Sequence, residues 1–106
     1  MGQNDVWQLI CNSFAQNPRD VITIPMSKKG KWFFVYTEKD SVFIESGRSH
    51  SDACKIKGRR RLEEKKCKKM LEIYYKRCEG QSVTKEAIAT TYNQVYWYGI
   101  FADLEL

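Results

Sequence analysis

The sequence has few of the residues and patterns that mark secreted, metal-binding or membrane-spanning proteins. It contains one histidine, two prolines and four cysteines in 106 residues. Its longest apolar runs, at 32–36 and 95–101, are far shorter than the roughly 18 to 20 residues that cross a bilayer. No basic segment followed by an apolar one marks a secretory signal at its start. We therefore expect a soluble cytoplasmic protein that does not contact a membrane.

The cysteines are too widely spaced for the common zinc motifs. Cys11, Cys54, Cys67 and Cys78 are 43, 13 and 11 positions apart, whereas a zinc site uses close pairs such as Cys-x2-Cys. Without a sign of secretion, this pattern favours free thiols in a reducing compartment. We expect neither a metal nor a cofactor.

Positive charge is concentrated in one stretch of the chain. The formal net charge is +5, yet residues 55–69 contain nine lysines or arginines and only two glutamates. This stretch therefore carries a net charge of +7, and the remaining residues sum to −2. Because polyanions are attracted by local clusters of positive charge, this stretch is the first candidate for a binding surface.

Hydrophobic spacing predicts one α+β domain that covers residues 1–106. Val6, Ile10 and Phe14 recur every four residues, which is typical of an amphipathic helix over 5–17. Short runs of β-branched and aromatic residues then predict three strands, at 21–24, 32–37 and 42–45. Because the connecting turns are short, we expect these strands to form an antiparallel meander.

After a loop at 46–58, the rest of the chain is predicted to be helical. A helix over 59–79 would end at Gly80, and a last helix is expected from Ser82 or Thr84 onward. The apolar face of this last helix is predicted to contain Ile88, Tyr92, Val95 and Gly99. The predicted fold is therefore a three-stranded antiparallel sheet packed against two to three helices, in the order α-β-β-β-α-α. At 100° per residue, the apolar arc of the basic helix is formed by Cys67, Met70, Ile73, Tyr74 and Cys78.

The basic stretch suggests contact with the phosphates of nucleic acid. Arginine suits bidentate contact with phosphate better than lysine does, and Arg59, Arg60 and Arg61 are consecutive. Several such contacts would give affinity that is independent of base sequence and falls with salt. The alternative is a solvated charged face with local Glu–Lys pairs. The candidate phosphate-binding residues are Lys55, Lys57, Arg59, Arg60, Arg61, Lys65, Lys68 and Lys69.

The most strongly predicted strand offers a second candidate surface. Period-two alternation places Trp32, Phe34 and Tyr36 on one face, and Phe33 and Val35 on the other. Exposed rings on a sheet stack the bases of single strands. In a half-buried sheet such a row more often faces the core. We therefore expect the helices to cover these three side chains, which we call the Trp32 row.

The predicted order of a helix, a three-stranded meander and a helix resembles that of double-stranded-RNA-binding domains, whose last helix presents basic residues to phosphates. The chain departs from that family's small-residue pattern at Met70, Leu71 and Tyr74. Residues 82–89 resemble the first helix of a helix-turn-helix, but 94–101 contains no Arg or Lys to read a groove. Element order alone assigns no function.

Catalysis has little support in the sequence. The single histidine, His50, lies beside serine, aspartate and cysteine at 48–54, but a fold normally brings nucleophile and base together from distant positions. The sequence shows neither a motif of paired carboxylates nor a glycine-rich phosphate loop. We expect a protein that is not an enzyme.

The aromatic segment at 95–101 is the last candidate surface. It is apolar on all sides of a predicted helix, with a strand as the alternative. Because Tyr and Trp anchor many interfaces, this segment could join two copies of the chain or hold another protein. A small domain also needs such side chains for its own core. The candidate interface residues are Tyr96, Trp97, Ile100 and Phe101.

Two functions follow from these patterns. The first is non-catalytic binding of nucleic acid, DNA or RNA, by a small basic protein that contacts backbone phosphates through a basic helix. The alternative is a protein–protein interaction or regulatory module, which docks as a homodimer through its aromatic C-terminal segment or presents the basic helix to an acidic protein. Steep salt dependence would favour the first function. A change of assembly state on altering Trp97 or Phe101 would favour the second.

Overall fold

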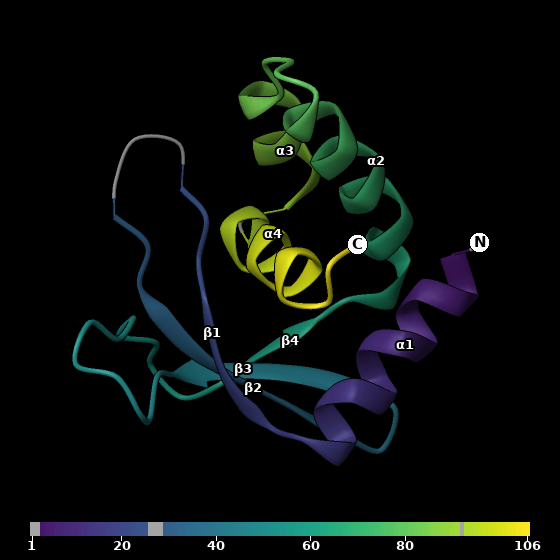
Figure 1. The fold of residues 1–106 in the computed structure, drawn as a ribbon. Helices are drawn as coiled ribbons and strands as arrows, with labels where there is room; N and C mark the ends of the chain where they lie inside the picture. The colour runs from purple at the N-terminus through teal and green to yellow at the C-terminus, as the bar shows by residue number, and fades with distance from the viewer. Residues whose placement is uncertain (1–2, 26–28, 92) are drawn as a thin grey trace.

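The computed structural model describes residues 3–25, 29–91 and 93–106, and these residues form an α+β fold (Figure 1). In chain order the elements are α1 (Gln3–Gln16), β1 (Arg19–Ile22), β2 (Trp32–Glu38), β3 (Ser41–Ser46), β4 (Arg60–Leu62), a 3₁₀ turn η1 (Glu64–Lys66), α2 (Cys67–Cys78), α3 (Thr84–Thr90) and α4 (Gln94–Asp103). The predicted α+β class is confirmed. The predicted order is wrong in two places, because the described chain has a fourth strand and a further helix in its second half.

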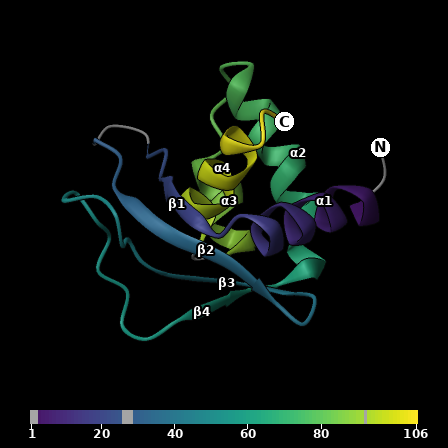
Figure 2. The same cartoon turned by 60° about the horizontal axis from the view of Figure 1, so that its bottom comes forward.

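The strands form one antiparallel sheet in the order β1-β2-β3-β4, so each strand pairs with its neighbour in sequence (Figure 2). The predicted meander of the first three strands is confirmed. Lys39 and Asp40 join β2 to β3 with φ values of 49° and 63°, the left-handed backbone that a two-residue hairpin requires. β1 begins at Arg19 rather than at Val21, because Arg19 already pairs with Val35 of β2.

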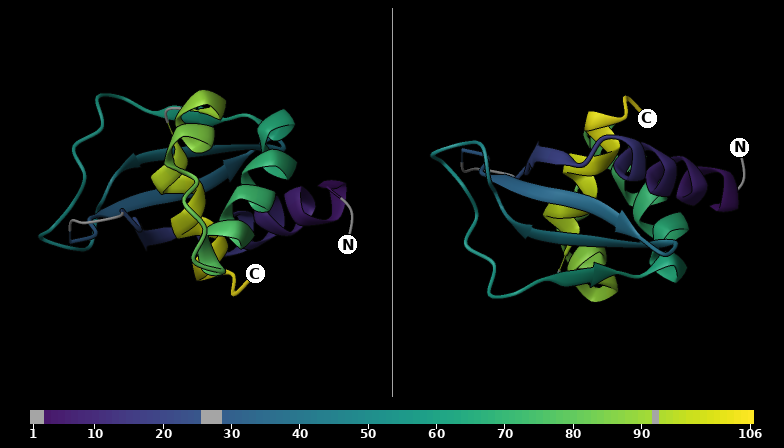
Figure 3. Two further views of the ribbon diagram at one scale, coloured as in Figure 1. Left: turned by 90° about the horizontal axis from the view of Figure 1, so that it is seen from above. Right: turned by 90° about the horizontal axis from the view of Figure 1, so that it is seen from below.

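The helices cover one face of the sheet. In Figure 3 the helices lie in front of the strands when seen from above, and the strands lie in front when seen from below. On the covered face, Phe33, Val35 and Ile44 are fully buried, and they share a core with Phe14 of α1 and Trp97 of α4. Packing against the helices therefore fixes which side of each strand points inward.

The predicted helix over 59–79 is wrong in its first turns. Residues 60–62 form β4 instead, and α2 begins only at Cys67. The reason is that β4 pairs with the edge of β3 and buries Leu62 beside Val42. The predicted apolar arc is confirmed at four positions of α2, where Cys67, Met70, Ile73 and Tyr74 are buried. Cys78, the fifth predicted member of this arc, is exposed.

The last part of the chain forms two helices where one was predicted. Thr91 adopts an extended backbone between α3 and α4. Ile88, predicted on the apolar face, is 52% exposed. Tyr92, predicted on the same face, lies outside the described residues. Within those described ranges, no helix is long and apolar enough to cross a membrane.

The aromatic C-terminal segment lies inside the molecule. α4 crosses the inner face of the sheet (Figure 3). Trp97, Ile100 and Phe101 are fully buried, and Tyr96 is partly buried against the same core. The close approach requires Gly99, because a Cβ there would collide with a carbonyl oxygen of β1. The predicted interface is thus corrected: three of its four side chains pack within this chain and offer no exposed docking surface.

Candidate functional site

Aromatic side chains gather on the face of the sheet that the helices leave uncovered. Trp32, Phe34 and Tyr36 alternate with core residues along β2, and Phe43 of β3 lies opposite Tyr36. All four are partly exposed, and the view from below in Figure 3 shows their strands in front of the helices. The expectation that the Trp32 row is covered is therefore wrong, because the opposite side of β2, at Phe33, faces the helices. We call this uncovered surface the open face.

The rings of the open face form a patch. The ring centroids of Phe34 and Tyr36 are 6.0 Å apart, and those of Tyr36 and Phe43 are 5.6 Å apart with planes inclined by 26°. These separations are in the range of interacting aromatic pairs. Three neighbouring rings of β2 and β3 thus lie side by side on the surface.

Two guanidinium groups lie over these rings. Arg48 places its Cζ 3.9 Å from the centroid of Phe34, and Arg59 places its Cζ 3.9 Å from that of Phe43. Arg59 Nη1 also donates hydrogen bonds of 3.1 Å to Tyr36 Oη and Glu38 Oε2. These bonds to Tyr36 and Glu38 raise the pKa of Arg59 above its ordinary value. The open face therefore combines ring faces with two guanidinium groups, each of which is paired with a carboxylate, Arg48 with Glu45 and Arg59 with Glu38.

A loop after β3 is held against the open face by one carboxylate. Asp20 of β1 accepts hydrogen bonds from the backbone nitrogens of Arg48 at 2.9 Å and Ser49 at 2.7 Å, and its Oδ2 lies 2.9 Å from Nδ1 of His50. The imidazole of His50 stacks on Trp32, with centroids 3.6 Å apart and planes inclined by 6°. Burial alone would raise the pKa of Asp20, but hydrogen bonds from Arg48, Ser49 and His50 outweigh burial and lower it.

A hollow of about 400 Å³ lies on the open face. It is lined by Pro18, Phe34, Tyr36, Glu45 and Arg48. Among these lining residues, Arg48 Nη2 donates to Glu45 Oε2 at 2.9 Å. Aromatic rings and an ion pair thus line the same hollow.

The eight predicted phosphate-binding residues do not share one helix face. Lys55, Lys57 and Arg59 are exposed in the loop before β4, and Arg61 lies opposite Phe43 on the open face. Arg60 points to the other side of the sheet. Its Nη1 donates to Oδ1 of Asn93, the residue before α4, at 3.3 Å. The other three predicted residues, which η1 and α2 carry, are Lys65, Lys68 and Lys69.

Two lysines of α2 form ion pairs with a glutamate of α3. Nζ of Lys69 lies 2.8 Å from Glu86 Oε1, and Nζ of Lys76 lies 3.2 Å from the same oxygen. These contacts with Lys69 and Lys76 lower the pKa of Glu86 below its ordinary value. The predicted single basic helix face is therefore wrong, because the basic residues lie on two sides of the molecule. Arg59 and Arg61 lie beside the aromatic patch, and the lysines of α2 lie on the helical side.

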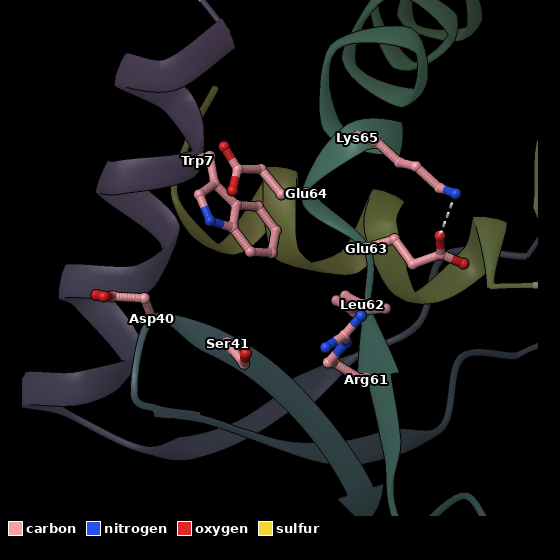
Figure 4. A pocket seen from close by; sticks show the side chains of 8 residues that line it. All are labelled: Trp7, Asp40, Ser41, Arg61, Leu62, Glu63, Glu64 and Lys65. Atoms are coloured by element: carbon pink, nitrogen blue, oxygen red, sulfur yellow. Dashed lines mark ion pairs between the residues drawn. The ribbon is translucent and has the colours of Figure 1, made fainter.

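A second hollow lies between α1, the β2–β3 hairpin and β4 (Figure 4). Its volume is about 500 Å³, and its lining residues are Trp7, Asp40, Ser41, Arg61, Leu62, Glu63, Glu64 and Lys65. Lys65 Nζ lies 3.2 Å from Glu63 Oε2. Carboxylates outnumber cations in this lining, and one of the two cations, Arg61, also lies beside Phe43 on the open face. The described residues also contain no cluster of potential metal-binding side chains.

The two fully buried thiols are poor nucleophiles. Burial is the largest influence on both and raises the pKa of Cys11 to about 11 and that of Cys67 to about 12. Such thiols remain protonated at neutral pH. Cys54 is partly buried and Cys78 is exposed, and all four cysteines are free.

Comparisons with protein-family models, curated proteins and solved structures found no significant similarity to this chain. The site is therefore interpreted from its own side chains. Sequence patterns did not identify Asp20, Glu45 or Arg48 as parts of it. Alternation along the predicted strand at 42–45 could have placed Glu45 beside the aromatic row. No local pattern indicates that Asp20 holds a loop that follows it by 28 or more residues.

Proposed function

We propose that this protein binds single-stranded nucleic acid on the open face of its sheet, without catalysing a reaction. The observation that carries the proposal is the pairing of a ring patch at Phe34, Tyr36 and Phe43 with guanidinium groups at Arg48 and Arg59. Rings bind the bases of a strand, and guanidiniums bind both bases and phosphates. This combination fits a nucleic acid better than it fits a purely acidic or purely apolar partner.

Stacking supplies the contact with bases. Each base that stacks on an aromatic side chain contributes about 1–3 kcal/mol, whatever its identity. A base can also stack on a guanidinium plane, so Arg48 above Phe34 and Arg59 above Phe43 extend the stacking surface. A strand that crosses β2 and β3 would thus meet several stacking positions in succession.

Phosphate contacts come from the β4 side of the face. Arg61 is exposed opposite Phe43, and the exposed Lys55 and Lys57 lie in the loop that leads into β4. Arg61 is the cross-strand neighbour of Phe43, and we expect the backbone of a stacked strand to run along this side of the face, toward Lys55 and Lys57. Each phosphate that they neutralise releases counterions, so binding should weaken as the salt concentration rises.

A duplex fits this surface less well. Bases inside a duplex are already stacked on each other, and proteins recognise double-stranded RNA mainly through phosphates and 2′-hydroxyls. A row of rings adds little to such contacts. The helix predicted to present basic residues to a duplex is also interrupted by β4, and its Lys69 is paired with Glu86.

The proposal is tested by fluorescence-anisotropy titration with labelled strands of about ten nucleotides, within the site sizes of sheet-based binders. The arms are single-stranded RNA, single-stranded DNA and duplexes of each, between about 50 and 200 mM salt. We expect the single strands to bind more tightly than the duplexes. The two single-stranded arms identify which sugar the face prefers.

A matched pair of variants locates the binding surface. Tyr36 lies in the patch, whereas Tyr75 is 45% exposed on α2. We expect Tyr36→Ala to weaken binding by at least about tenfold, as the loss of one stacked base predicts, and Tyr75→Ala to bind like the wild type. No binding to any strand at low salt, or equal losses in both variants, would contradict the proposal.

A further inference from the structure

We propose that the hollow between Pro18 and Arg48 is a pocket for a single guanine base, an inference that rests on the proposed function. Phe34 and Tyr36 form its aromatic lining, and Glu45 and Arg48 supply its polar groups. Its volume of about 400 Å³ is large enough to hold a purine with part of its sugar. Arg48 lies over Phe34, so a base beside Arg48 would stack on Tyr36. A ring face can stack a base of any kind, so the preference must come from the ion pair.

The Glu45–Arg48 pair presents a definite pattern of acceptors and donors. Arg48 Nη2 donates to Glu45 Oε2 at 2.9 Å, which sets the carboxylate and the guanidinium side by side. Oε1 of Glu45 has no hydrogen-bond partner within the described part of the chain, and Oε2 can accept a second hydrogen bond. The pair therefore offers two acceptors, Oε1 and Oε2 of Glu45, followed by a donor, the guanidinium of Arg48. Cytosine presents its hydrogen-bonding groups to guanine in the same order.

Guanine is the base that complements this pattern. Its pairing edge has two adjacent N–H donors, at N2 and N1, followed by the O6 acceptor. The donors can reach both oxygens of Glu45, and O6 can accept from Arg48. In uracil or thymine a single N–H lies between two carbonyl oxygens, which a carboxylate repels. Adenine and cytosine each offer one amino group beside an acceptor nitrogen.

Other charged groups near the hollow do not duplicate this role. Asp20 lies on the same face, but its oxygens already accept from Arg48, Ser49 and His50. Glu38 is bound by Arg59 at the far side of Tyr36. Glu45 is thus the carboxylate of the open face that lines this hollow and retains an oxygen for a ligand.

The test uses short uridine strands in which one central base is guanine, adenine, cytosine, uracil or hypoxanthine, titrated by fluorescence anisotropy. We expect the strand with guanine to bind about tenfold more tightly than all-uridine, the size of one good base contact. Hypoxanthine lacks the N2 amino group and should fall between them. Glu45→Gln, which replaces an acceptor with a donor, should remove the preference while the all-uridine strand still binds.

Glu72→Gln is the matched control, because Glu72 is exposed on α2, away from the open face. This variant should keep the tenfold preference. Equal affinity for all the central bases, or a guanine preference that survives Glu45→Gln, would overturn the guanine assignment and leave single-strand binding intact. Failure of every strand to bind would overturn both proposals.

Discussion

The two faces of the sheet differ in chemistry although the same strands build both. The inner face buries its side chains fully under the helices, as at Phe33, Val35, Val42 and Ile44. The open face holds partly exposed rings, and charged groups lie over them or between them. Neighbouring residues of one strand thus have separate roles. The inner face stabilises the fold, and we propose that the open face binds a ligand.

The largest expected effect separates these roles within two adjacent residues of β2. Phe33 is fully buried, whereas Phe34 is partly exposed on the open face. Phe33→Ala should lower the free energy of unfolding by about 3–5 kcal/mol, because it leaves a cavity in the core. Phe34→Ala should lower it by about 1 kcal/mol, chiefly through the lost contact with Arg48.

Urea denaturation measures both stabilities, and anisotropy measures strand binding by the folded variants. Phe34→Ala should keep its fold and bind single strands at least several-fold more weakly. If Phe34→Ala destabilised the protein as much as Phe33→Ala does, the division between the two faces would be wrong.

The next effect concerns the carboxylate that holds the loop on the open face. Asp20→Asn should cost about 1–2 kcal/mol at neutral pH, because hydrogen bonds to a charged acceptor become neutral ones. The pKa of Asp20 is lowered on folding, so its contribution is present above the ordinary value of 3.8 and is lost as the pH falls through the folded value.

Urea denaturation of the wild type and Asp20→Asn between neutral and strongly acidic pH tests this linkage. The stability difference between the two proteins should shrink as the pH falls below the ordinary value of 3.8. A difference that did not shrink below that value would show that Asp20 does not gain its partners on folding. Other carboxylates titrate equally in both proteins and cancel in the comparison.

The smallest effect compares cations on opposite sides of the molecule. Arg61 lies on the open face, whereas Lys68 is exposed on α2. Arg61→Glu should weaken strand binding about fivefold and reduce the slope of log affinity against log salt by about 1, as the loss of one phosphate contact predicts. Lys68→Glu changes net charge equally and should have little effect. The reverse ranking would return the phosphate contacts to α2.

The spacing of apolar residues predicted the elements whose conformation depends mainly on their own sequence. Val6, Ile10 and Phe14 are spaced for a helix and are buried in α1, and the aromatic run of β2 is a strand as expected. β4 has only three residues and follows a basic segment, so its pairing with β3 decides its conformation. No feature of residues 59–62 alone distinguishes that outcome from a helix.

The candidate site was predicted less well than the fold. Alternation showed that Trp32, Phe34 and Tyr36 share a face, but not whether helices would cover it. That depended on the apolar α4, which packs against Phe33 on the opposite side of β2. The loop at His50 has no periodic pattern, and its place over Trp32 depends on distant hydrogen bonds.

The most direct test of the central claim is an NMR titration of isotope-labelled protein with an unlabelled single strand. Single-strand binding on the open face predicts that the largest chemical-shift changes lie in β2 and β3, at the Trp32 indole and around Arg48. The amides of α2 should change little. Largest changes along η1 and α2, with β2 unaffected, would contradict the claim and place the ligand on the helical side.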